Sequence, residues 1–90
     1  MESDWRVDID ALSFQPAGHR GNCVVHRRAF RSLLGFEPAP NDCRFYFIAQ
    51  QAAFLAAAAT KIARAGITSD SHFHLNSRDI RHALRGIDPA

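Results

Sequence analysis

The stretch 41–65 constrains the fold most, because it carries the longest continuous helical pattern in the chain. Pro40 lies directly before this stretch, and proline is compatible with the entry to a helix but not with its interior. Asn41 is a good N-cap, since its side-chain oxygen can accept a hydrogen bond from an amide of the first turn. Gly66 suits the position just after a helix end. We therefore predict one long central helix over residues 41–65.

The faces of this predicted helix differ in kind. One side is an apolar stripe, and the other is rich in alanine, which is either a solvated back or the surface of a close helix–helix contact. Phe45 and Tyr46 point away from the stripe and favour a second contact, with the N-terminal segment or with a partner chain. The stripe consists of Cys43, Phe47, Phe54, Ala58, Ile62 and Ala65, with Ile48 and Leu55 on its shoulder, and the alanine-rich side of Ala49, Ala52, Ala53, Ala56 and Ala63.

Length and composition indicate a single globular domain. The chain has 90 residues, of which 47% are hydrophobic, so we expect one domain over 1–90, with residues 1–10 as a partly mobile lead-in. The first residues are acidic where a signal peptide is basic, and no run reaches the ~18 apolar residues of a membrane span. Cys23 and Cys43 lie on apolar patterns and are predicted to be buried thiols. We therefore expect a cytoplasmic protein with no membrane partner.

The other segments alternate between short strands and short helices. Residues 5–10 alternate apolar and polar, which suits a half-buried strand or an extended lead-in, and residues 11–15 continue as a strand. Turn residues at 16–21 reverse the chain and residues 22–26 return, so we predict one antiparallel hairpin. A helix over 27–34, a strand over 72–75 and a helix from Asn76 are also predicted. The expected fold is α+β, with a small antiparallel β-sheet in the order β-β-α-α-β-α packed against the long central helix.

Three segments carry a pattern that is typical of a known family. They are Trp5 with Ala11-Leu12-Ser13-Phe14, then Cys23 to Phe30 with Leu33 and Leu34, then Asp42-Cys43 through Arg64-Ala65-Gly66 to Phe73–Ile80. Their order and spacing resemble the domain of unknown function 1488 family of small bacterial proteins. The resemblance covers nearly the whole chain and implies a compact α+β domain of bacterial origin, but it brings no activity, ligand or catalytic residue. His26 and Arg28 depart from it, since the family pattern places threonine and glutamate there, and the family's short strand ahead of Trp5 is missing.

The first candidate for a binding site is the start of the predicted helix 27–34. Arginine at the positive end of a helix dipole is unfavourable, and an anion there would offset the repulsion and bond the free amides. We therefore predict that a phosphate, a carboxylate or a nucleic-acid backbone binds around Arg20, His26, Arg27, Arg28 and Arg31. The alternative is a solvated basic surface.

A metal site is not predicted, although two histidines are suggestive. His72 and His74 are two apart in a predicted strand and so project from one face. Zinc needs three or four convergent ligands, and neither these histidines nor the pair Cys23 and His26 has a further ligand that must join it. His72 and His74 therefore remain weak candidates, and we expect no cofactor.

The sequence contains no pattern that indicates catalysis. It lacks a nucleophile elbow, a phosphate-binding glycine loop and a zinc-protease motif, and thiols on apolar patterns are inert. We predict no catalytic residue, and a small non-catalytic binding or protein-interaction module. Its partner is either a second copy of the chain, bound as a homodimer through the alanine-rich side or a sheet edge, or another protein. The alternative is a weak nucleic-acid or anion binder that uses the arginine cluster.

Overall fold

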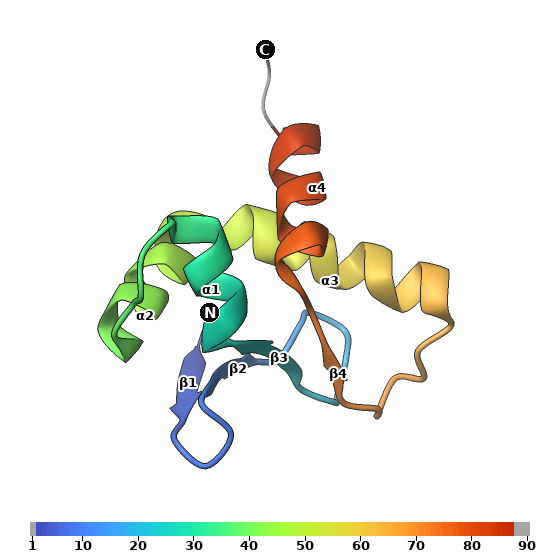
Figure 1. The fold of residues 1–90 in the computed structure, drawn as a ribbon. Coiled ribbons are helices and arrows are strands. Elements are labelled where there is room, and N and C mark those ends of the chain that lie inside the picture. Colours follow the sequence, from blue (N-terminus) through green and yellow to red (C-terminus); the bar gives the residue numbers. More distant parts are fainter. Residues whose placement is uncertain (1, 88–90) are drawn as a thin grey trace.

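The computed structural model describes residues 2–87, and Figure 1 shows its helices gathered on one side of a small sheet. This arrangement confirms the predicted α+β class. The elements are β1 Ser3–Arg6, β2 Ala11–Phe14, β3 Cys23–His26, α1 Arg27–Leu34, α2 Pro40–Ala49, α3 Gln51–Ala65, β4 Phe73–His74 and α4 Ser77–Ile87. No helix among the described residues has both the length and the apolar character needed to cross a membrane.

The sheet has four strands in the order β1-β2-β3-β4. Its first three strands are antiparallel, as predicted, whereas β4 runs parallel to β3. The sheet is therefore mixed. This follows from the connection between β3 and β4, because three helices intervene and such a crossover returns the chain in the same direction.

The segment before β2 is a hairpin of its own, which the alternating pattern of residues 5–10 does not predict. Strand β1 ends at Arg6, and residues 7–10 turn, with the amide of Ile9 donating to the Arg6 carbonyl at 3.3 Å. Asp10 has a φ of 52°, a left-handed conformation that aspartate tolerates better than most residues. Val7 is 84% exposed, so the alternation does not mark a buried face. The predicted single hairpin is therefore two hairpins, β1–β2 and β2–β3.

The prediction of one continuous central helix is wrong, because the helix is interrupted at Gln50. This residue has φ −113° and ψ 28°; its amide donates to the Tyr46 carbonyl at 2.9 Å and its carbonyl accepts from the Ala53 amide at 2.9 Å. Phe47 and Phe54, as predicted, are buried. Seven residues of a straight helix rise by about 10 Å, whereas these two ring centroids lie 5.1 Å apart. The break thus brings both rings into one contact.

The core lies between the sheet and the helices and is built around phenylalanine rings. Phe14 of β2 lies 5.0 Å from Phe47 of α2, and Phe30 of α1 lies 5.8 Å from Phe54 of α3, as ring centroids. Tyr46 also packs on the core, 6.1 Å from Phe54, so the expectation that it points away from the core stripe is wrong. One aromatic cluster therefore joins the sheet to three helices.

The alanine-rich side of the central segment is only partly solvated. Ala53 is buried and Ala56 is half-buried, whereas Ala49, Ala52 and Ala63 are exposed. Helix α4 packs across α3, as Figure 1 shows. Part of the alanine side therefore belongs to the fold, as small side chains that allow close contact predict, and part faces solvent.

Two loops meet at the edge of β4. His19 in the loop between β2 and β3 is buried, its Nε2 lies 2.7 Å from the Ser71 carbonyl oxygen, and its ring meets Phe73 edge-on. The amide of Arg20 donates to the Ser69 carbonyl at 2.7 Å. Gly21 leaves no room for a side chain, because an added Cβ would overlap the Ser71 carbonyl group. These contacts fix the short strand β4 to the rest of the sheet.

Candidate functional site

The predicted basic cluster is brought together only in part. His26 ends β3, and Arg27, Arg28 and Arg31 follow in the first turns of α1. Arg20 lies in the loop that joins β2 to β3, which is at the opposite end of β3 from His26. Including Arg20 in the cluster is therefore wrong, because the hairpin register separates residues that are close in sequence.

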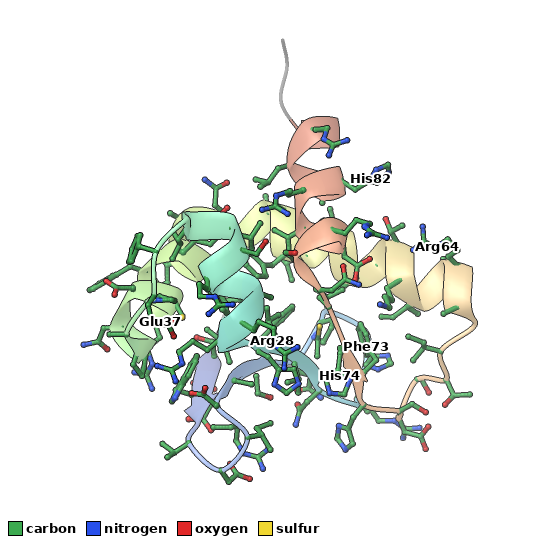
Figure 2. All side chains as sticks on the ribbon, viewed as in Figure 1. Arg28, Glu37, Arg64, Phe73, His74 and His82 are labelled. Atoms are coloured by element: carbon green, nitrogen blue, oxygen red, sulfur yellow. The ribbon has the colours of Figure 1, made fainter. Side chains whose placement is uncertain are left out.

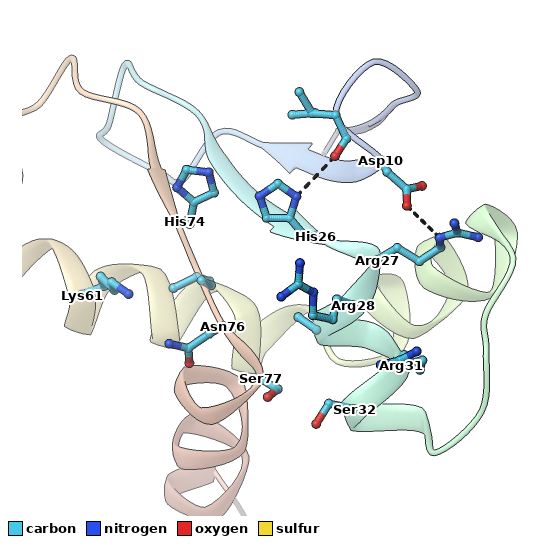
Figure 3. Close-up of a pocket in the computed structure, with 13 residues that line it drawn as sticks. Asp10, His26, Arg27, Arg28, Arg31, Ser32, Lys61, His74, Asn76 and Ser77 are labelled. Carbon is cyan, nitrogen blue, oxygen red and sulfur yellow. Dashed lines mark hydrogen bonds and ion pairs between the residues drawn. The ribbon is translucent and has the colours of Figure 1, made fainter.

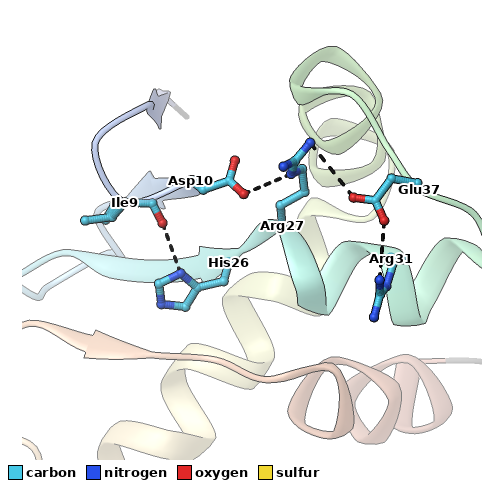
Figure 4. Close-up of polar contacts among 6 residues, drawn as sticks. All are labelled: Ile9, Asp10, His26, Arg27, Arg31 and Glu37. Carbon is cyan, nitrogen blue, oxygen red and sulfur yellow. Dashed lines mark hydrogen bonds and ion pairs between the residues drawn. The ribbon is translucent and has the colours of Figure 1, made fainter.

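Acidic side chains from two loops neutralise part of the positive charge of this cluster (Figure 4). Arg27 donates through Nε to Asp10 at 2.9 Å and lies 3.9 Å from Glu37, and Arg31 lies 3.5 Å from Glu37. All four side chains are at least a third exposed, so each pair contributes less than about 1 kcal/mol. Arg28 has no ion pair within residues 2–87. It is the arginine of this helix start that remains available to a ligand.

Two histidines from neighbouring strands lie beside Arg28. The rings of His26 and His74 are stacked, with centroids 5.1 Å apart and planes 14° apart. The Nδ1 of His26 lies 3.3 Å from the Ile9 carbonyl oxygen, and because a carbonyl can only accept, this nitrogen is the donor. His74 points outward since Phe73 and Leu75 on either side of it are buried, which is the alternation expected for a strand.

These side chains line a hollow of about 860 Å³ between the sheet and the helices α1, α3 and α4 (Figure 3). We call it the larger hollow. Arg28 and His74 lie near one another in the view of the whole molecule as well (Figure 2). The lining residues are Ile9, Asp10, His26, Arg27, Arg28, Ala29, Arg31, Ser32, Lys61, His74, Leu75, Asn76 and Ser77.

A smaller hollow of about 470 Å³ adjoins the larger one. The two share Asn76 and Ser77, and the smaller hollow is completed by Arg78, Arg81 and Arg85 of α4. We call the two hollows together the basic channel. Seven of the eleven lysine and arginine residues of the chain line this channel, and Asp10 is its one carboxylate among the described residues.

Helix α4 is held beside α1 by one of these arginines. The guanidinium of Arg81 donates to the Ser32 carbonyl at 2.6 Å and to the Ser32 hydroxyl at 3.0 Å. Sequence reasoning did not include Arg78, Arg81 and Arg85 in the site. Their spacing of three and four residues, which places them on one helix face, was the available signal.

The weak metal candidates do not converge. His72 accepts a hydrogen bond at Nδ1 from the Asn22 amide at 2.9 Å, whereas His74 stacks on His26. Among residues 2–87 no group of three or more histidine, cysteine, aspartate or glutamate side chains could hold a metal ion.

Both thiols are buried, as predicted. Burial raises the pKa of the Cys23 thiol to about 12 and that of the Cys43 thiol to about 11. A thiol must lose its proton to act as a nucleophile. Neither cysteine therefore presents a reactive thiolate at neutral pH.

A second surface of note lies on the outer side of α2. Phe45 is 69% exposed, Ile48 is 63% exposed and Ala49 is also exposed. The prediction that Ile48 packs at the shoulder of the core is wrong, because Cys43 and Phe47 define the buried face of α2 and Ile48 lies outside it. We call Phe45, Ile48 and Ala49 the α2 surface.

Comparisons with protein-family models, with curated proteins and with solved structures find no match. The resemblance to the domain of unknown function 1488 family therefore stays a prediction. The function has to be argued from the side chains of this chain alone.

Proposed function

We propose that the protein is a non-catalytic binding module that holds the phosphate groups of a nucleic-acid strand in the basic channel. The observation that carries this proposal is the charge of the channel, which is lined by seven of the eleven basic residues and by a single carboxylate among the described residues. Basic side chains that line a concave surface concentrate the positive potential and attract polyanions.

The channel offers four arginines with no ion pair among residues 2–87. They are Arg28, Arg78, Arg81 and Arg85. The other three basic residues form ion pairs. Arg27 pairs with Asp10, Arg31 with Glu37 and Lys61 with Asp79. Each phosphate contact to a single strand contributes about 0.7 to the slope of log K against log salt, so we expect a slope of roughly −3 and weak binding at physiological salt.

The three arginines of α4 suit a strand rather than a single anion. Their positions 78, 81 and 85 place them along about 10 Å of one helix face. The larger hollow continues this row beyond Asn76 and Ser77. A ligand that fills the channel therefore needs several negative groups joined in a row.

Fluorescence polarisation with a labelled 12-nucleotide single strand tests the proposal. We expect saturable binding at 50 mM NaCl that weakens at least tenfold at 200 mM. Arg78→Ala/Arg85→Ala removes two contacts, so the affinity should fall and the salt slope should become smaller by about 1.4.

The matched control is Arg20→Ala/Arg44→Ala, which removes the same charge from exposed positions outside the channel. This control should keep the affinity and the slope. Absence of binding at 50 mM NaCl, or equal losses in the two double variants, would contradict the proposal.

Self-association through the α2 surface is a second candidate function, which the exposure of Phe45 and Ile48 favours. Ala49 lies one helical turn from Phe45 on α2, so a twofold pair of α2 helices would set a large side chain of one copy against a small one of the other. The side chains of Phe45 and Ile48 expose roughly 250 Å², well below the ~800 Å² per partner of a stable interface, so the dimer would be weak.

Sedimentation equilibrium from 10 µM to 1 mM tests this second candidate. We expect association near the upper concentration, and Phe45→Ser should abolish it. Phe36→Ser is the control, since Phe36 is 52% exposed in the segment between α1 and α2 and outside the α2 surface. A wild-type protein that stays monomeric throughout would exclude self-association.

A further inference from the structure

The positive charge of the channel stops at the larger hollow. Its rim on one side is Ile9 and Asp10, in the turn after β1. Residues 7–10 of this turn contain Asp8 and Asp10 and no basic residue, and Asp8 accepts hydrogen bonds of 3.0 and 2.7 Å from Arg6. A polyanionic strand that lies along α4 therefore finds no unpaired cation beyond this side of the larger hollow. The end of a strand, rather than its middle, fits there.

The larger hollow contains side-chain nitrogens that form no hydrogen bond with another residue among 2–87. Arg28 lies between the histidine pair and Ser77, as Figure 3 shows, and it has no ion pair within residues 2–87. His26 uses Nδ1 to bind the Ile9 carbonyl, which leaves Nε2 directed elsewhere. His74 contributes a second ring from the neighbouring strand. These groups come from α1, β3 and β4, so they surround a point rather than follow a line.

The charges around the histidine pair give this hollow a preference for a highly charged anion. Four cations line it with the pair, namely Arg27, Arg28 and Arg31 from α1 and Lys61 from α3. Asp10 is the one carboxylate among the described residues that line it, and it is bound to Arg27. This excess of positive charge favours the more negative of two phosphate groups.

A terminal phosphate differs from an internal one in its charge and in its number of acceptor oxygens, and a hollow lined by cations can distinguish the two. A phosphomonoester carries a charge of about −1.5 to −2 at pH 7 and three acceptor oxygens, whereas an internal phosphodiester carries a single charge. Charge-assisted hydrogen bonds from the guanidinium of Arg28 are stronger with the doubly charged group.

We propose that the larger hollow binds the terminal phosphomonoester of a nucleic-acid strand, whose following phosphates lie along the arginines of α4. This inference rests on the proposed function of the basic channel. It adds that the protein distinguishes a phosphorylated strand end from a hydroxyl end, through Arg28, His26 and His74.

The test compares 12-nucleotide strands that differ only at one end. Each strand has a fluorophore at one end and either a phosphate or a hydroxyl at the other, and both polarities are measured at 100 mM NaCl. For one polarity we expect the phosphate to raise the affinity about tenfold at pH 7. His26→Gln/His74→Gln should bind the two strands with equal affinity, whereas Arg20→Ala/Arg44→Ala should keep the tenfold difference.

Two outcomes would overturn the inference. One is equal binding of phosphorylated and hydroxyl ends at pH 7 for both polarities, and the other is a phosphate preference that survives in the double histidine variant. Both leave the salt-dependent binding of hydroxyl-ended strands intact, so they are distinguishable from failure of the proposed function, in which no strand binds. Both histidines are exposed, so the double variant should fold, and a circular dichroism melt checks this.

Discussion

Replacing Phe54 by alanine should be among the most damaging changes to this fold. The side chain is 0% exposed, and its ring centroid lies 5.1 Å from Phe47, 5.8 Å from Phe30, 6.1 Å from Tyr46 and 6.4 Å from Phe14. A buried Phe→Ala change costs about 3–5 kcal/mol through lost transfer free energy and a residual cavity. Contacts with four aromatic rings place Phe54 at the upper end, so we expect a loss of about 5 kcal/mol.

Urea and thermal unfolding followed by circular dichroism measure this loss. A domain of this length has a free energy of unfolding of roughly 5–13 kcal/mol, so the variant loses a large share of it. The midpoint temperature should fall by about 20 °C or more. Phe45→Ala is the matched control, because it removes the same atoms from a ring that is 69% exposed, and it should cost less than about 0.5 kcal/mol.

The reasoning fails if the two variants lose similar stability, or if Phe54→Ala loses less than about 2 kcal/mol. Either result would mean that the aromatic cluster around the break at Gln50 is not the centre of the core.

Three further predictions concern single groups. Gly21→Ala forces a Cβ into the Ser71 carbonyl and should lower the free energy of unfolding in urea by at least about 2 kcal/mol. The control Gly86→Ala, whose Cβ meets nothing within 4 Å, should be neutral or stabilising. Equal stability of the two variants would refute the close approach of Gly21 to Ser71. Burial raises the pKa of Cys23 from 9.0 to about 12, so its contribution to stability is full below about pH 9 and is lost as the pH rises through 12. The urea midpoint should therefore be lower at pH 10.5 than at pH 8. The Cys23 thiol of the native protein should also resist alkylation, and fast labelling in native buffer would contradict its burial. Asp79→Ala should lower the free energy of unfolding in urea by about 1–2 kcal/mol, because it removes part of the cap at the start of α4. In this cap Asp79 accepts a hydrogen bond from the Asn76 amide at 3.0 Å, and its own amide donates to the Asn76 side chain at 2.8 Å. An unchanged urea midpoint would rule out a stabilising cap.

Local signals were enough to place several elements. The predicted helix 27–34 matches α1, and Gly35 and Gly66 both adopt the left-handed conformation that a helix end needs. Strand β3 was expected from its β-branched residues. In each case the side chains that determine the helix or strand lie within a few residues of it, so the local sequence is enough to predict the element.

Two boundaries were predicted wrongly, the break in the central helix at Gln50 and the turn at residues 7–10, and local sequence signals do not determine either of them. Nothing in Gln50 or Gln51 disfavours a helix, and the interruption is explained by the contact it allows between the rings of Phe47 and Phe54. The turn at 7–10 contains neither glycine nor proline. Its one local signal is the left-handed Asp10, which sequence patterns alone rarely identify.

The candidate site could be predicted only where it is continuous in sequence. Residues 26–31 were recognised as one basic cluster, but their acidic partners Asp10 and Glu37 come from other loops. The arginines of α4 join the channel because Arg81 binds Ser32 of α1, which is a tertiary contact. Arg20 was included for its position in the sequence and is excluded by the strand register.

The two-residue strand β4 determines when the basic channel can form during folding. The side of the channel that α1 provides needs only the first half of the sequence, whereas the side that α4 provides exists only after residues 73–87 have docked beside β3. A ligand that contacts both sides would therefore stabilise the docked position of β4 and α4. Transient detachment of residues 73–87 would open the channel and release such a ligand.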